Sequence, residues 1–332
     1  MKDVLEAMYQ GKKFSRAEAQ ALLLSMVQES VPDVQVAALL SALRTRGVSS
    51  NELAGFRLAL QELAIPIRVD LPVIDMCGTG GDGKNTFNIS TLAAFVVAAC
   101  GVPVAKHGNY GVSSICGSSN VIEALGVEFT TDERLLNLML SEARICILHA
   151  PLFHPAMKRF APIRKALGVK TVFNLLGPLV NPCKPGMQYS GVYQHEYLRL
   201  YAEVMEAESI SYSLVHSLDG FDEISLTGPF KHVSNFKEEQ LAPKDFDLPC
   251  YEIQQLAGGD SIEDSKQIFL SILEGKRSAA QNDVVCINAA FALAVATKKP
   301  IQETLADARE ALDSGAALHT LNQLIKVSKE SR

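Results

Sequence analysis

The hydrophobic pattern of the first 65 residues predicts helices and no strand. Two segments, Ser15–Glu18 and Ser49–Glu52, have the Ser-x-x-Glu spacing of a capping box, whose side chains bond the free backbone N–H groups at a helix start. Asp33, after Pro32, is a third candidate cap. The apolar runs are wider than one amphipathic stripe, which fits an internal core and packing against a second subunit equally well. The expected helices are 15–27, 34–46 and 49–64.

After Pro66 short apolar strands alternate with helices, a pattern typical of a mostly parallel sheet covered by helices. The predicted fold class is α/β, with a small all-helical N-terminal domain (1–70) and a larger α/β domain (71–332) around a mostly parallel central sheet. A hairpin is expected around Gly228-Pro229, between 223–226 and 232–236. The expected strands are 73–77, 102–107, 145–150, 188–193 and 212–217; the expected helices are 88–100, 118–125, 133–143 (capped from Thr130), 154–167, 196–206, 262–274, 283–297, 301–312 and 317–328.

Two turns rich in glycine and serine, Gly78–Ser90 and Lys106–Ser118, each follow a predicted strand and lead into a predicted helix. This arrangement presents several backbone N–H groups to one anion. Lys106 adds a positive charge, and Gly108 permits close approach of the backbone. Because the turns lie one strand–helix unit apart, they predict one ligand that carries two phosphate groups, or a phosphate and a diphosphate.

Residues 78–85, GTGGDGKN, approach two common nucleotide-binding patterns and fulfil neither. The dinucleotide fingerprint needs an acidic residue at the end of the second strand, where this chain has Ala105-Lys106-His107. A P-loop needs Ser or Thr at the position of Asn85, to hold magnesium. The first turn is therefore interpreted as a phosphate site of another kind.

Four further side chains suggest ligand or metal contacts. Ser90 or Thr91 can cap the helix that begins there, and because both cannot be the cap, at least one is left for a ligand or metal. Asp222 and Glu223 follow a turn at Asp219-Gly220, and such a pair is surface charge in most proteins. Beside two phosphate turns it becomes a candidate for binding magnesium, which accompanies diphosphates and prefers carboxylate and water ligands.

Composition narrows the class of protein. The 332 residues are 48% hydrophobic and 20% charged, as in a globular protein, and the formal charge of −6 disfavours nucleic-acid binding, which needs a basic face. The 7 cysteines include no C-x-x-C pair, so neither a zinc site nor a disulfide framework is indicated. The N-terminus lacks the apolar core of a signal peptide, and no apolar run reaches the length of a membrane span. We expect a cytoplasmic protein without nucleic-acid or membrane partners.

Together these segments resemble the anthranilate phosphoribosyltransferase family of tryptophan biosynthesis. The resemblance covers nearly the whole chain, and the joint occurrence of its motifs is highly specific. The matching segments are GTGGDGxxTFNIST (78–91), VAKHGN (104–109), SSxxGSxxVxEALG (113–126), HPAMKxxAPIRKxLGxxTxFNLLGPLxNP (154–182), GxDGxDEISLTG (217–228, with Ser217 in place of the first Gly) and DAREALDSGxA (307–317).

The resemblance implies a fold of the nucleoside phosphorylase and phosphoribosyltransferase kind, with substrates bound between the two domains. It also implies that residues 154–176 or so join the helical domain, and that two copies form a homodimer through it. The implied reaction transfers the phosphoribosyl group of 5-phosphoribosyl 1-pyrophosphate (PRPP) to the amine of anthranilate and releases pyrophosphate. It is assisted by Mg²⁺, two ions per subunit, without a covalent intermediate or a catalytic nucleophile.

Carried onto this chain, the family's site residues fall in both turns and at three later positions. Arg164 and Asn109 would hold anthranilate, with Gly78 also near it; a guanidinium can bind the anthranilate carboxylate through two hydrogen bonds. His107 and Asp82 would hold position or assist proton movement. The implied metal ligands are Ser90, Asp222 and Glu223. The implied substrate-binding residues are Gly78, Gly81, Asp82, Thr86, Asn88, Ile89, Ser90, Thr91, Lys106, His107, Gly108, Asn109, Tyr110, Gly111, Val112, Ser113, Ser114, Ser118 and Arg164.

Three positions depart from the family pattern. Tyr110 stands where Arg is common, Ile115 where Lys is common and Asn120 where Asp is common. The loss of two cations beside a diphosphate predicts weaker binding, unless magnesium or main-chain donors compensate. Two alternatives stay open: a pyrimidine nucleoside phosphorylase of the same fold, disfavoured by 88–91, Arg164 and the acidic pair, and a non-enzymatic nucleic-acid binder, disfavoured by the net charge of −6.

Overall fold

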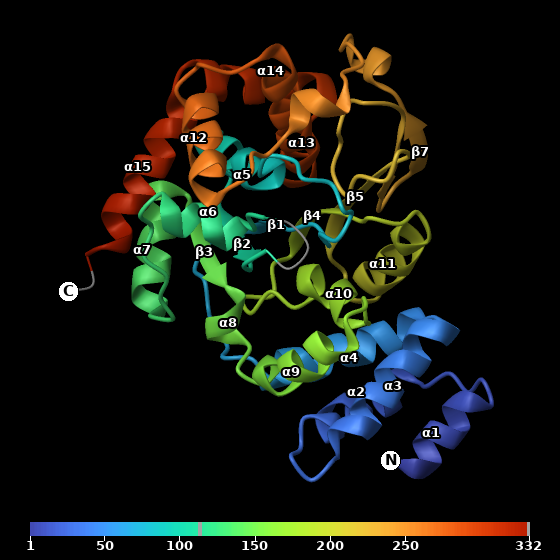
Figure 1. Cartoon of the computed structure of the whole chain (residues 1–332). Coiled ribbons are helices and arrows are strands. Elements are labelled where there is room, and N and C mark those ends of the chain that lie inside the picture. The colour runs from blue at the N-terminus through green and yellow to red at the C-terminus, as the bar shows by residue number, and fades with distance from the viewer. Residues whose placement is uncertain (112–114, 331–332) are drawn as a thin grey trace.

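The computed structural model describes residues 1–111 and 115–330. Four helices form the N-terminal part at one end of the molecule, and the later elements build a sheet flanked by helices (Figure 1). The predicted α/β class with a helical N-terminal domain is confirmed. The helices are α1 (Lys2–Tyr9), α2 (Arg16–Met26), α3 (Asp33–Arg46), α4 (Ser50–Leu63), α5 (Ile89–Ala99), α6 (Ser118–Ala124), α7 (Glu133–Ala143), α8 (Ala150–Phe153), α9 (Met157–Leu167), α10 (Phe173–Leu176), α11 (Glu196–Ala207), α12 (Ile262–Leu273), α13 (Ala279–Thr297), α14 (Ile301–Asp313) and α15 (Ala316–Ser328), with short 3-10 helices at Gly177–Leu179, Pro243–Phe246 and Ile253–Leu256.

The sheet has seven strands in the order β3-β2-β1-β4-β5-β6-β7. The strands β1 to β5 are parallel, as predicted, and β6 and β7 are antiparallel additions at one edge. The chain runs outward from β1 to β3 and then returns to β4 on the other side of β1, so the strand order reverses between β1 and β4. Ligands of open α/β sheets usually bind at the carboxyl ends of the strands beside such a reversal. The strands are β1 (Ile74–Met76), β2 (Val104–Gly108), β3 (Ile145–His149), β4 (Met187–Gly191), β5 (Ser211–Ser217), β6 (Phe230–Ser234) and β7 (Glu238–Leu241).

The predicted hairpin between residues 223–226 and 232–236 is wrong. The strand β6 pairs with β5 and with β7, while 223–226 forms no strand. The reason is a side chain from far along the sequence: Asn288 on α13 accepts a hydrogen bond from the N–H of Ile224 (3.0 Å) and donates one to its carbonyl (2.8 Å). Because these backbone groups are satisfied without a strand partner, the segment can turn sharply, and Leu226 has a φ of +57°.

Apolar side chains form two clusters on the two faces of the sheet. On β5, Tyr212 and Leu214 belong to one cluster and Val215 to the other, as the alternation of a strand requires. The cluster around α5 and α13 is the core of the α/β domain. The helix α13 is long and apolar enough to cross a membrane by length and composition, but 67% of its most apolar window is buried inside the fold.

The second cluster joins the N-terminal helices to segments from the middle of the chain. It includes Leu39 of α3 and Phe56 of α4 together with Phe160 of α9 and Phe173 of α10. The helix α11 extends this cluster to the sheet, through residues such as Leu198. Residues 157–176 therefore pack with helices that lie more than 100 positions earlier in the sequence.

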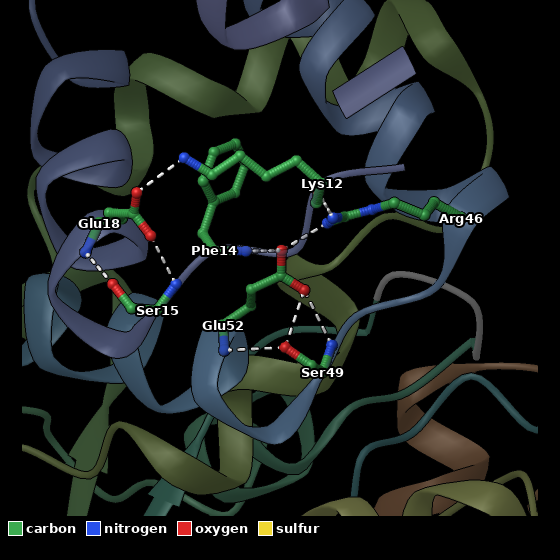
Figure 2. A network of polar contacts seen from close by, with 7 residues as sticks. All are labelled: Lys12, Phe14, Ser15, Glu18, Arg46, Ser49 and Glu52. Atoms are coloured by element: carbon green, nitrogen blue, oxygen red, sulfur yellow. Dashed lines mark hydrogen bonds and ion pairs between the residues drawn. The ribbon is translucent and has the colours of Figure 1, made fainter. Parts of the chain in front are cut away.

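Both predicted capping boxes of the helical part are formed, at Ser15 and at Ser49 (Figure 2). In the second box Glu52 is fully buried and bonds further groups outside the box. Its Oε2 accepts from the N–H of Ser49 (2.9 Å), and its Oε1 accepts from the N–H of Phe14 (3.0 Å) and pairs with Arg46 (Figure 2). One buried carboxylate thus joins the start of α2, the end of α3 and the start of α4.

Two other predicted caps are wrong. Asp33 is the first residue of α3, after Pro32 in the cap position, and its carboxylate pairs with Arg159 at 2.6 Å instead of capping. At α7 the cap is Asp132, whose Oδ1 accepts from the N–H of Arg134 (2.9 Å). The hydroxyl group of Thr130, two residues before Asp132, accepts a hydrogen bond from the N–H of Asp132 (3.0 Å) and so orients the cap.

Candidate active site

A cavity of about 510 Å³ lies where the parallel strands end. The turns after β1 and β2 line it, as do Asp222 and Glu223 from the loop after β5. Residues of α8, α9 and α10 supply a further wall. The volume is in the usual range for a small-molecule site, and the position matches the strand reversal beside β1.

The two carboxylates after β5 hold the first turn. Asp222 Oδ2 accepts a hydrogen bond from the N–H of Gly80 (2.6 Å), and Glu223 Oε1 accepts one from the N–H of Ser90 (2.8 Å). The approach is so close that a Cβ on Gly78 would lie 2.7 Å from Asp222 Oδ2. The acidic pair and the first turn, distant in the sequence, therefore form one unit.

Two asparagines fix the first turn to its neighbours. Asn88 Nδ2 donates to the carbonyl of Cys116 (3.1 Å), which ties the first turn to the second. Asn85 Nδ2 donates to the carbonyl of Gly259 (2.7 Å) in the segment before α12. Asn85 therefore has a structural partner at the position where a P-loop would place its magnesium ligand.

The helix α5 begins at Ile89, with Asn88 in the cap position and no side-chain cap. The prediction that Ser90 or Thr91 caps this helix is therefore wrong. Both residues lie in the first helical turn and line the cavity. Ile89 has its side chain in the core of the α/β domain, and its N–H donates to the carbonyl of Phe87 (2.6 Å).

The second turn is fixed at both ends. Lys106 is buried, and its ammonium group donates to the carbonyl of Met76 at the end of β1. Asn120 Oδ1 accepts from the N–H of Gly111 (2.9 Å) and from the N–H of Gly117 (3.0 Å), which closes the turn at its base. An aspartate could accept the same two hydrogen bonds, so Asn120 keeps the geometry that the family's common residue would give.

Tyr110 contacts two neighbouring side chains, His149 and Glu123. Its ring lies edge-on to His149 at 4.6 Å, and its hydroxyl lies 3.3 Å from the carboxylate of Glu123. Ile115 is 47% exposed and contributes no charge. Neither position carries a cation. Tyr110 anchors the turn to α6 and β3, and Ile115 is an exposed apolar side chain.

Three acidic side chains meet at the first turn. Burial raises the pKa of Asp222 well above its ordinary range, and the charges of Asp82 and Glu223 raise it further. Burial and then the charge of Asp82 raise the pKa of Glu223 to about 7, against the bond from Ser90, and burial also raises the pKa of Asp82. Mutually repelling carboxylates are the hard oxygen donors that suit Mg²⁺. Within residues 1–111 and 115–330 no three acidic, histidine or cysteine side chains form a complete cation cage, so substrate and water oxygens would have to complete the coordination.

Arg164 of α9 lines the same cavity. Its guanidinium lies over the ring of Phe173, 5.6 Å from the centroid. Burial lowers its pKa, and the guanidinium has no hydrogen-bond or ion-pair partner in the described part of the chain. A planar cation held on an aromatic ring and open to the cavity is suited to bind a carboxylate.

Two histidines, His107 and His154, also line the cavity. His107 Nδ1 lies 3.0 Å from the carbonyl of Gly177, which can only accept, so Nδ1 carries the proton and Nε2 is an acceptor without a partner among the described residues. The ring of His154 lies 5.2 Å away. Burial and the neighbouring His154 lower the pKa of His107 to about 3, and burial lowers that of His154 to about 4. Both rings are therefore neutral at physiological pH.

Most of the predicted site residues line this cavity, while Ile89 does not, and Val112, Ser113 and Ser114 lie outside the described residues. Sequence reasoning missed several lining residues, among them His154, Phe173, Asn174 and Gly177. The available signal was the apolar, glycine- and proline-rich composition of 174–186. The predicted residues that line it are Gly78, Gly81, Asp82, Thr86, Asn88, Ser90, Thr91, Lys106, His107, Gly108, Asn109, Tyr110, Gly111, Ser118, Arg164, Asp222 and Glu223.

Comparisons with known proteins agree with this geometry. Residues 70–318 match the α/β domain of a glycosyl transferase family, and residues 2–64 match the helical bundle domain of the same family. The anthranilate phosphoribosyltransferase of Flavobacterium johnsoniae is 48% identical over 99% of this chain and 100% of its own length.

Solved structures of the same kind superpose closely. The enzyme from Thermus thermophilus is 36% identical with a TM-score of 0.92, over 98% of this chain and 99% of its own. The Saccharomyces cerevisiae enzyme in complex with PRPP and Mg is 29% identical with a TM-score of 0.85, over 94% of this chain and 92% of its own. Full-length identity of this degree, with the two joined turns and the acidic pair at one cavity, shows that the chain belongs to the anthranilate phosphoribosyltransferase family.

Proposed function

We propose that this chain transfers the phosphoribosyl group of PRPP to the amine of anthranilate, as the names of its relatives describe. The products are N-(5-phosphoribosyl)anthranilate and pyrophosphate, in tryptophan biosynthesis. The observation that carries the proposal is the cavity itself, which is lined by two joined phosphate-type turns, by an acidic pair and by Arg164. The turns and the acidic pair suit a diphosphate with its metal, and Arg164 suits an aromatic carboxylate.

The PRPP end consists of the two turns. The proposed donors for phosphate oxygens are backbone N–H groups of the first turn and the hydroxyl groups of Ser90, Thr91 and Ser118. The N–H groups of Gly80 and Ser90 are excepted, because they bond the acidic pair. Asn88 and Asn120 keep the turns in place through their backbone partners. Because these donors are fixed before the ligand arrives, they need little reorganisation as charge develops on the departing pyrophosphate.

Asp222 and Glu223, with Ser90 beside them, are the proposed ligands of two Mg²⁺ ions per subunit. The fit rests on the donor set. Burial raises the pKa of Glu223 and the charge of Asp82 raises it further, and a bound cation would offset both effects. The PRPP complex of the yeast relative contains Mg, which supports the same use here. When bound, magnesium supplies electrostatic stabilisation of the pyrophosphate leaving group.

Arg164 and Asn109 would hold anthranilate, with Gly78 also near it. A carboxylate bound to the Arg164 guanidinium would direct the aromatic amine back toward the first turn, and holding the two reacting groups together supplies much of the rate. The unpaired Nε2 of neutral His107 is an acceptor suited to orient the N–H of the amine. No nucleophilic side chain is needed, so the transfer is direct.

A homodimer through the helical domain and a cytoplasmic location complete the proposal. The helical part exposes large apolar side chains, Tyr9 at 64% and Val34 at 74%, which a partner subunit could cover. Sedimentation of the purified chain would measure the oligomeric state. A monomer at micromolar concentration would contradict the dimer.

The test of the reaction is the fluorescence of anthranilate, followed with PRPP and magnesium. We expect loss of the signal that depends on all three components. Omission of PRPP and addition of EDTA are the controls. Unchanged fluorescence with micromolar protein and all components present would overturn the proposed reaction.

A further inference from the structure

Lys170 is a cation that does not line the cavity but contacts the first turn. It lies in the short segment between α9 and α10, partly buried, and its ammonium group donates a hydrogen bond to the carbonyl of Gly81 in the first turn. The same ammonium lies 3.8 Å from the centroid of the Tyr193 ring. Tyr193 itself is bound to the first turn, since its N–H donates to Thr79 Oγ1 at 3.2 Å.

The first turn needs such an external contact because its own residues provide little stiffness. Gly80 and Gly81 have φ values of +63° and +77°, and with no side chain at either position their peptide planes can rotate at low energy. In a trans peptide the carbonyl and the next N–H point in opposite directions. A hydrogen bond that holds the Gly81 carbonyl toward Lys170 therefore holds the N–H of Asp82 away from it. Asp82 and Gly81 both line the cavity, which does not include Lys170.

The surroundings of Lys170 agree with a site between domains. Burial lowers its pKa, and Arg44 of α3 lowers it further, while Asp82 and Asp222 act in the opposite direction. The charges that act on Lys170 are thus those of a cation of the helical part and of carboxylates of the proposed PRPP end. Its segment is anchored behind it, because Thr171 donates its N–H to Asn174 Oδ1 at 2.9 Å.

We propose that Lys170 is a positioning residue for PRPP. By holding the Gly81–Asp82 peptide from the helical side, it keeps the first turn in the conformation that receives the diphosphate. It also links that turn to the chain around Arg164, which lies six positions earlier, in α9. The inference rests on the proposed assignment of the first turn to PRPP.

The test compares Lys170→Met with Lys170→Arg and Lys165→Met. Methionine keeps an apolar stem against Tyr193 and removes the donor, arginine keeps a donor and a cation, and Lys165 is an exposed lysine of α9 outside the cavity. Calorimetric titration of PRPP with magnesium should give a Kd for Lys170→Met about tenfold weaker than for the parent chain. Lys170→Arg should recover most of the affinity, and Lys165→Met should leave it unchanged.

The kinetic pattern separates positioning from loosened folding. For Lys170→Met the KM for PRPP should rise while the KM for anthranilate at saturating PRPP, and the midpoint of thermal unfolding, stay close to the parent values. An unchanged Kd for PRPP, an equal effect of Lys165→Met, or an equal rise of both KM values would overturn the role of Lys170. If the parent chain does not bind PRPP at all, the proposed function fails instead.

Discussion

The carbonyl oxygen of Asp222 lies where a side chain on Gly191 would begin, 1.4 Å from the position of its Cβ. Gly191 ends β4, next to β1, so the loop that carries the proposed metal ligands crosses directly over the strand end. Gly191→Ala should displace this loop and destabilise the fold by about 2–3 kcal/mol, as overpacking of a rigid contact does. Magnesium-dependent activity should be lost as well.

Gly186→Ala is the matched control for that substitution. Gly186 lies just before the same strand, and a Cβ there would meet nothing within 4 Å. Denaturant unfolding of both variants measures the difference. Equal stability of Gly191→Ala and Gly186→Ala would contradict the packing argument.

Magnesium alone should stabilise the protein more at high pH than at low pH. The pKa of Glu223 is raised to about 7, so the folded state without a cation loses stability as pH rises from the ordinary value of 4.5 through 7, where the unfolded carboxyl is already ionised. A bound cation relieves this loss only when the carboxylates are ionised. The rise in Tm on adding MgCl2 should therefore be small near about pH 5.5 and larger near about pH 8.5.

Sodium chloride at matched ionic strength is the control for screening by salt. In Glu223→Gln the pH dependence of the magnesium effect should shrink. A magnesium effect of the same size at both pH values in the parent chain would argue against these carboxylates as the metal site.

Arg164→Met should raise the KM for anthranilate about tenfold or more, because a charge-assisted, two-pronged contact is lost. Arg164→Lys should recover only part of it, since an ammonium group cannot form the paired contact. The KM for PRPP should change less than about twofold, because the bonds that hold the first turn come from Asp222 and Glu223 and not from Arg164. Initial rates from anthranilate fluorescence measure the KM values of both variants and of the parent chain. A selective rise in the KM for PRPP would contradict the assignment of Arg164.

Asn120→Leu should weaken PRPP binding about tenfold, because two backbone N–H groups at the base of the second turn lose their acceptor. Asn120→Asp keeps an acceptor of the same shape and should stay within about threefold of the parent chain. The pair distinguishes acceptor geometry from charge. If both variants bind PRPP equally poorly, the amide group itself is required and the acceptor argument is wrong.

The fold was predictable where its signals are local. The serine–glutamate boxes at Ser15 and Ser49 are formed as expected, and the alternation after Pro66 gave the parallel strands. The prediction failed where one distant side chain decides the backbone, as Asn288 does for Ile224. Such a hydrogen bond does not change the hydrophobic pattern of the segment whose backbone it holds, so that pattern does not reveal it.

The site divides in the same way. The two turns and the acidic pair carry their chemistry in their own composition, and the structure brings them to one cavity. Lys106 was expected to offer a point charge for a ligand, and it is buried with its ammonium group on the Met76 carbonyl. Lys170 gave no signal at all, because its partner is a backbone carbonyl that lies 89 positions away in the sequence. Composition reveals which groups are available, while their partners depend on the packing of the whole chain.

The path of the chain between the two apolar clusters limits how the two parts of the molecule can move. The polypeptide leaves the helical part after α4, returns to it through α8, and leaves again after α10 (Figure 1). A part attached by one connection can swivel freely, whereas one attached by three can rock only about an axis that runs near all of them. The N-terminal helices also cannot be cut away as an independent unit, since a truncation after residue 64 would expose Phe160 and Phe173 to water. Any motion of the helical part relative to the sheet must therefore bend the chain at all three connections, 64–73, 150–157 and 176–187.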